Sequence, residues 1–71
     1  MAYTITAPLP GRIWEILVKV GQQISEDEAV LILEAMKMEN EIYANQSGTI
    51  KKILVEKDQT VKVGEALIEV E

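Results

Sequence analysis

The chain consists of two similar halves, and this internal repeat limits the folds that are open to it. Residues 7–34 align with residues 44–71 when the sequence is shifted by 37 positions, and no gap is needed. Ten of the 28 aligned positions are identical, and they include the glycine that opens the segments GRIWEILV and GTIKKILV. Because aliphatic composition alone does not explain shared glycine and alanine positions, we interpret the match as an internal repeat.

Each half has the pattern of short β-strands. β-branched residues are frequent in residues 11–18 and 48–55, and the apolar runs AVLIL and ALIEV follow after polar stretches that contain Gly or Asp. Apolar runs separated by such turn residues are typical of strands. Neither half can bury its apolar face alone. The repeat therefore predicts an all-β fold, in which two small sheets with about eight strands pack face to face about a pseudo-twofold axis.

The length and composition exclude several classes of protein. With 71 residues the chain is expected to form one domain, residues 1–71. It has no Cys and no His, so we expect no disulfide, no metal site and no histidine-based catalysis. The net charge of −5 argues against nucleic acid and anionic membranes as partners. No apolar run approaches the ~20 residues of a membrane span, and the lack of Cys is compatible with the cytoplasm, where we expect the protein.

The most distinctive motif, EAMKMEN, lies between the two halves at residues 34–40. The only internal methionines, Met36 and Met38, flank Lys37. One apolar strand leads to this lysine and another leaves it, which predicts a β-hairpin with Ala35, Met36 and Lys37 at or near its tip. We expect both methionines to be at least partly exposed, because the 22 Ile, Leu and Val residues are enough to form the core.

Three interpretations of this lysine are open from the residues alone. A catalytic lysine needs a pocket, for which so short a chain has little room, and the usual companion residues are missing. An ordinary solvated turn lysine, with methionines as core fillers, predicts an unmodified interaction domain. A modification site predicts that another enzyme acylates the amine, which then carries a cofactor on the flexible lysine side chain.

The whole chain resembles the biotinyl domains, or biotin carboxyl carrier proteins, of biotin-dependent carboxylases, decarboxylases and transcarboxylases. EAMKMEN is similar to the biotin attachment motif of that family, and APLPGRI is similar to its Pro-Gly segment, some 26 residues upstream of the lysine. Residues 47–71 are similar to the second half of the family's domain. The resemblance implies a flattened β-barrel, or barrel-sandwich hybrid, of two four-stranded antiparallel sheets with pseudo-twofold symmetry.

The resemblance also implies a function. Lys37 would carry covalent biotin, surrounded by Glu34, Ala35, Met36 and Met38. The domain would be a non-catalytic carrier without catalytic residues of its own: a biotin protein ligase would biotinylate it, and it would shuttle carboxyl groups between a biotin carboxylase and a carboxyltransferase. Lipoyl domains share the fold but usually have Asp before the lysine and Ala after it. A lipoyl-type carrier or an unmodified interaction domain is the alternative.

The repeat also predicts where the chain ends lie. Under the 37-residue shift Met38 corresponds to Met1, so the twofold mate of the Lys37 hairpin is the gap between the two termini. We therefore expect Met1 and Glu71 on adjacent strands, at the end of the sandwich opposite Lys37.

Overall fold

The computed structural model describes residues 2–71, and the regular structure within this range is entirely β. No helix in the described range is long and apolar enough to cross a membrane. The strands are β1 (Tyr3–Thr6), β2 (Gly11–Ile16), β3 (Gln23–Ile24), β4 (Ala29–Ala35), β5 (Met38–Tyr43), β6 (Gly48–Ile53), β7 (Thr60–Val61) and β8 (Ala66–Val70).

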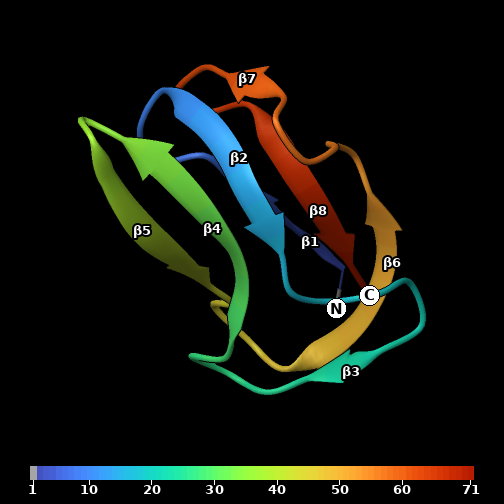
Figure 1. Cartoon of the computed structure of the whole chain (residues 1–71). Helices are drawn as coiled ribbons and strands as arrows, with labels where there is room; N and C mark the ends of the chain where they lie inside the picture. The colour runs from blue at the N-terminus through green and yellow to red at the C-terminus, as the bar shows by residue number, and fades with distance from the viewer. Residues whose placement is uncertain (1) are drawn as a thin grey trace.

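The strands form two four-stranded antiparallel sheets, which confirms the predicted fold class. One sheet has the strand order β1-β8-β6-β3, and the other has the order β5-β4-β2-β7. The sheets lie against each other as two layers, with the long hairpin of β4 and β5 at one side (Figure 1). Because the edge strands of one sheet do not pair with those of the other, the molecule is a flattened sandwich rather than a closed barrel.

The pairing of the strands repeats with the same 37-residue shift as the sequence. Tyr3 pairs with Val70 between β1 and β8, and the equivalent residues Asn40 and Leu33 pair between β5 and β4. The irregularity in β2 between residues 13 and 15 recurs in β6 between residues 50 and 52. The sequence repeat therefore corresponds to a pseudo-twofold axis that exchanges the two sheets, as predicted.

The turns that follow β2 and β6, and those that follow β3 and β7, show the same symmetry with exchanged residue types. Gly21 and Asp58 occupy equivalent positions and have positive φ angles of 91° and 72°. Asp27 and Gly64 form a second equivalent pair, at 68° and 83°. Glycine and aspartate both tolerate this left-handed region better than most residues. The polar stretches with Gly or Asp in the sequence are thus the points at which the chain turns.

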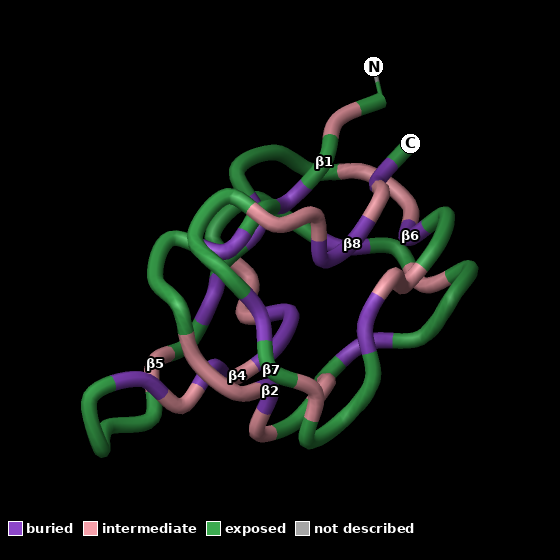
Figure 2. The backbone as a smooth tube through the Cα atoms, turned by 90° about the horizontal axis from the view of Figure 1, so that it is seen from above, coloured by how far each residue is buried: buried purple, intermediate pink, exposed green. Residues whose placement is uncertain are grey.

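The hydrophobic core lies between the two sheets and is built from aliphatic side chains of both halves. Ile13 and Leu33 of one sheet and Ile50 and Leu67 of the other are at most 1% exposed. Each such side chain contributes about 1.5–3 kcal/mol on full burial. None of the described polar or charged residues is buried. Buried segments of all the longer strands converge on this interior (Figure 2).

The first and last strands of the chain lie side by side. β1 and β8 are neighbouring antiparallel strands, and the pairing of Tyr3 with Val70 places the first and last strand residues side by side. The hairpin tip between β4 and β5 lies at the opposite end of the molecule from the start of β1 and the C label (Figures 1 and 2). The prediction named Met1 and Glu71: Met1 lies outside the described residues, and Glu71 directly follows β8 at the end of the sandwich where β1 begins.

Candidate functional site

The EAMKMEN motif forms the tip of the β4–β5 hairpin. Ala35 ends β4 and pairs with Met38, which begins β5, so Met36 and Lys37 alone form the turn. Their φ angles are 54° and 63°. Positive φ at both central residues defines a type I′ turn, which usually carries Asn-Gly or Asp-Gly. The predicted hairpin is therefore confirmed, but its turn holds two residues that each cost about 1–2 kcal/mol in this conformation.

The side chains of the tip extend into solvent. Met36 is 87% exposed and Met38 is 65% exposed, so the expectation that the methionines lie outside the core is confirmed. Lys37 between them is exposed too. Among the described residues, no side-chain hydrogen bond or salt bridge involves Lys37. The amine thus lies at the outermost point of the hairpin. Within residues 2–71, no side-chain hydrogen bond or salt bridge holds it.

The base of the tip is packed tightly against the start of β2. Ala35 is only 5% exposed, so its side chain supports the turn from the interior. Gly11 lies so close that a Cβ atom on it would be 2.3 Å from the carbonyl oxygen of Glu34 and 3.3 Å from the Cβ of Ala35. Since a carbon and an oxygen atom cannot approach to 2.3 Å without displacement, only glycine fits at position 11. This contact anchors the hairpin to the sandwich directly below Lys37.

Glu34, predicted to belong to the surround of Lys37, points its carboxylate toward Arg12 on the neighbouring strand. Arg12 donates hydrogen bonds to Oε1 of Glu34 from Nε at 3.2 Å and from Nη2 at 3.0 Å. Its Nη1 forms a salt bridge with Asp58, and its guanidinium lies 5.3 Å from the ring centroid of Trp14. Arg12 on β2 therefore braces the hairpin through Glu34 on β4. As these groups are partly exposed, each pair contributes less than about 1 kcal/mol.

Arg12 and Asn40 support the hairpin, and sequence reasoning did not single them out. The Nδ2 of Asn40 donates to the carbonyl oxygen of Met38 at 3.1 Å and more weakly to that of Leu33 at 3.4 Å. The available signal was the repeat itself: Arg12 and Asn40 occupy positions where the other half has Thr49 and Tyr3. At these two positions the hairpin side has side chains that bond within the hairpin and to the strand beside it.

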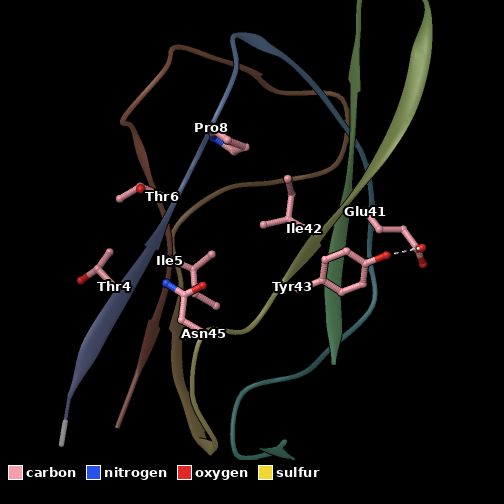
Figure 3. Close-up of a pocket in the computed structure, with 8 residues that line it drawn as sticks. All are labelled: Thr4, Ile5, Thr6, Pro8, Glu41, Ile42, Tyr43 and Asn45. Atoms are coloured by element: carbon pink, nitrogen blue, oxygen red, sulfur yellow. Dashed lines mark hydrogen bonds between the residues drawn. The ribbon is translucent and has the colours of Figure 1, made fainter. Parts of the chain in front are cut away.

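A shallow groove lies between the edge strands β1 and β5, away from the turn. Its volume is about 320 Å³, and its lining consists of four pairs related by the 37-residue shift, so it lies on the pseudo-twofold axis (Figure 3). The lining residues are Thr4, Ile5, Thr6, Pro8, Glu41, Ile42, Tyr43 and Asn45. The hydroxyl of Tyr43 donates to the carboxylate of Glu41 at 2.9 Å, and this hydrogen bond raises the pKa of Tyr43. The groove does not include Lys37.

Comparison with known proteins places the chain among biotin-dependent systems. Residues 3–70 match the model of the biotin/lipoyl family, described as biotin-requiring enzyme. The biotin carboxyl carrier protein of Streptococcus mutans is 52% identical over 67 residues, which are 94% of this chain and 52% of that protein. The pyruvate carboxylase of Staphylococcus aureus is 42% identical over 94% of this chain, but only 6% of that enzyme is covered.

A solved structure agrees with these sequence relatives. The urea carboxylase of Kluyveromyces lactis matches with a TM-score of 0.94 and 30% identity, over 100% of this chain and 6% of that enzyme. The chain thus spans about half the length of the carrier protein and a small part of each of the two carboxylases.

Proposed function

Because the chain belongs to the biotin/lipoyl family of biotin-requiring enzymes, we propose that it is a biotin carboxyl carrier domain with biotin attached to Lys37. The observation that carries this proposal is the geometry of the tip. Of the six lysines, Lys37 is the one in the two-residue turn of the β4–β5 hairpin, and its side chain is exposed. The tip fits a covalently attached group, because the amine is accessible and the hairpin below it is anchored by Gly11 and Ala35.

Attachment needs only one reactive group from this chain. The neutral amine of Lys37 attacks the carboxyl carbon of biotin, which a biotin protein ligase has activated with ATP. An amide C–N bond forms, the C–O bond to AMP breaks, AMP leaves with the electron pair, and the amine nitrogen loses a proton to solvent. The resulting amide is uncharged, whereas the unmodified lysine counts as one positive charge. The formal net charge of the chain therefore changes from −5 to −6.

The domain itself acts as a carrier and supplies no acid or base. When bound, biotin supplies a ring nitrogen that takes up and releases a carboxyl group. The hairpin keeps the attached group in the vicinity of a biotin carboxylase and a carboxyltransferase, so that encounters become nearly intramolecular. Similarity to carboxylases supports these partners. Cytoplasmic location and a single domain over residues 1–71 stay predictions from the sequence.

Mass spectrometry of the modified protein tests the proposal. After co-expression with a biotin protein ligase and biotin, we expect one biotinyl amide per chain, located on Lys37 by peptide mapping. Lys37→Arg should abolish the modification and change stability by less than ~0.5 kcal/mol, as is usual at exposed positions. Lys62→Arg is the matched control, because Lys62 is exposed as well. This variant should still be biotinylated on Lys37, as the wild type is.

Each alternative function gives a different spectrum. A lipoyl mass increment on Lys37 would favour a lipoyl-type carrier, and a chain that stays unmodified with active ligase would favour an interaction domain. Biotin found mainly on a lysine other than Lys37 would contradict the assigned attachment site.

A further inference from the structure

Four of the seven exposed large hydrophobic residues in the described range lie at the same end of the sandwich as Lys37, and the other three, Leu17, Val20 and Tyr43, lie away from the tip. Besides the two methionines of the tip, Leu9 is 39% exposed and Val63 is 65% exposed. Leu9 lies between two exposed prolines in the loop from β1 to β2, and Val63 lies in the turn from β7 to β8. We call Leu9, Val63, Met36 and Met38 the tip-end patch.

Hydrogen bonds and close packing join the parts of the tip-end patch. The amide of Gly64, next to Val63, donates to the carbonyl oxygen of Ala7 at 2.7 Å, and the amide of Ala7 donates to the carbonyl oxygen of Glu65 at 2.9 Å. The loop that carries Leu9 therefore starts beside the turn that carries Val63. The same loop ends at Gly11, which packs against the base of the hairpin. The loop thus connects the β7–β8 turn with the Lys37 tip.

The other half of the repeat shows that the fold does not require apolar residues at these places. By the 37-residue shift, Leu9 corresponds to Gln46 and Val63 corresponds to Glu26, at the opposite end of the sandwich. The backbone hydrogen bonds at the two ends are equivalent. The amide of Asp27 donates to the carbonyl oxygen of Ala44 at 2.9 Å, just as the amide of Gly64 donates to the carbonyl oxygen of Ala7. In these two pairs of loops the polar residues lie at the end away from Lys37 and the exposed apolar residues lie at the Lys37 end, whereas the turn after β2 places exposed Val20 at the far end and the equivalent turn after β6 places Lys57 at the tip end. Exposed apolar patches are typical of interaction sites.

The reach of the lysine side chain identifies which partner has to touch this patch. The hairpin extends beyond the first residues of β2 by little more than the Ala35–Met38 pair and its turn. An unmodified lysine amine lies only about 6 Å from its own Cα, given its four-carbon stem. An enzyme that acylates this amine must therefore approach the turn closely, where the neighbouring loop and Val63 lie. Once the longer biotin arm is attached, later partner enzymes can stand farther away.

We propose that the tip-end patch is the docking surface for the enzyme that acylates Lys37, and that this enzyme presents an apolar, uncharged rim around its active site. The proposal rests on the proposed function, since it presumes that Lys37 is acylated. Leu9, Val63 and the prolines beside Leu9 carry no charge, and the lysine at the centre of the tip inserts into the active site. Leu9 and Val63 bind the partner and take no part in the chemistry.

Exchange of residues between the two ends tests the docking surface. The double variant Leu9→Gln/Val63→Glu places at the tip end the residues that the other half already carries at equivalent positions. With a purified biotin protein ligase, we expect its KM for the domain to rise about tenfold while kcat changes little, because apolar contacts are lost but Lys37 is intact. The variant Gln46→Leu/Glu26→Val is the matched control at the opposite end and should keep the wild-type KM.

Further variants separate the contributing causes. Val63→Thr is uncharged and similar in shape, so a raised KM in this variant shows that lost apolar contact, and not the charge that Val63→Glu introduces, weakens docking. Circular dichroism establishes that each variant is folded. Should the double variant unfold, the exposed single variants Leu9→Gln and Val63→Thr carry the test.

Two results would overturn the proposal. One is a wild-type KM in folded Leu9→Gln/Val63→Glu; the other is an equal rise in KM for the opposite-end control. Failure of the proposed function looks different, because wild-type protein would then not be biotinylated at Lys37 at all.

Discussion

Replacement of Lys37 by glycine should make the domain more stable, although it removes the modification site. Lys37 has a φ angle of 63°, in a region that glycine enters without the steric conflict of a Cβ atom. Its exposed side chain contributes no packing that would be lost. The type I′ turn also prefers glycine at this second central position. The native lysine is therefore retained at a cost in stability, which is consistent with a role for its amine.

The size of the effect follows from two opposing terms. Relief of the left-handed conformation contributes about 1–2 kcal/mol. The greater freedom of glycine in the unfolded chain costs roughly 0.5–1 kcal/mol. We expect a net stabilisation of about 0.5–1 kcal/mol, which corresponds to a rise in Tm of roughly 3–6 °C for a domain of this length. Urea and thermal unfolding followed by circular dichroism measure both quantities.

Two control variants isolate the backbone effect. Lys37→Ala keeps the Cβ atom, so its stability should stay within ~0.5 kcal/mol of the wild type. Gly64→Ala makes the reverse change at a φ angle of 83°, where a new Cβ would meet no atom within 4 Å. It should destabilise by about 0.5–1 kcal/mol for the same reason. If Lys37→Gly proves no more stable than Lys37→Ala, the argument from backbone strain is wrong.

Three other changes have definite expected outcomes. Met36→Leu and Met38→Leu conserve volume and should cost less than ~1.5 kcal/mol, yet slow biotinylation or carboxyl transfer; unchanged kinetics in both would contradict a role in recognition. Gly11→Ala should destabilise by about 1–3 kcal/mol in urea unfolding, because its Cβ would lie 2.3 Å from a carbonyl oxygen of β4; wild-type stability would disprove the close contact. Glu41→Gln should lower the raised pKa of Tyr43 toward 10.0 in a titration of tyrosinate absorbance, and an unmoved midpoint would count against their hydrogen bond. As the folded-state pKa is raised, the stability from that bond is complete below pH 10 and is lost as the pH rises through the folded-state pKa.

The sequence by itself determined the architecture and the position of the modifiable lysine. The match of residues 7–34 with residues 44–71 predicts two equivalent sheets, because a duplicated segment that cannot bury its own apolar face packs against its copy. The hairpin at Lys37 and the adjacency of the first and last strands follow from the same shift. These features depend on the repeat and on the alternation of apolar and polar residues along each strand. Both can be read from the sequence itself.

Only the tertiary structure decided the details of the tip. Met36 and Lys37 have no turn preference that predicts a type I′ conformation, so the pairing of Ala35 with Met38 in the finished sheet imposes it. The ion pairs of Arg12 join residues that are 22 and 46 positions apart in the chain.

Contacts of this kind depend on strand register and on bulges, which the packing of the whole core sets. The tip-end patch likewise depends on the packing of the whole fold. A sequence alignment of the halves shows where Leu9 and Val63 differ from Gln46 and Glu26, but only the fold shows that the apolar pair lies at the same end of the sandwich as Lys37 and the polar pair at the other end. Proximity between such distant segments is a property of the packed sandwich, because no local interaction along the chain encodes it.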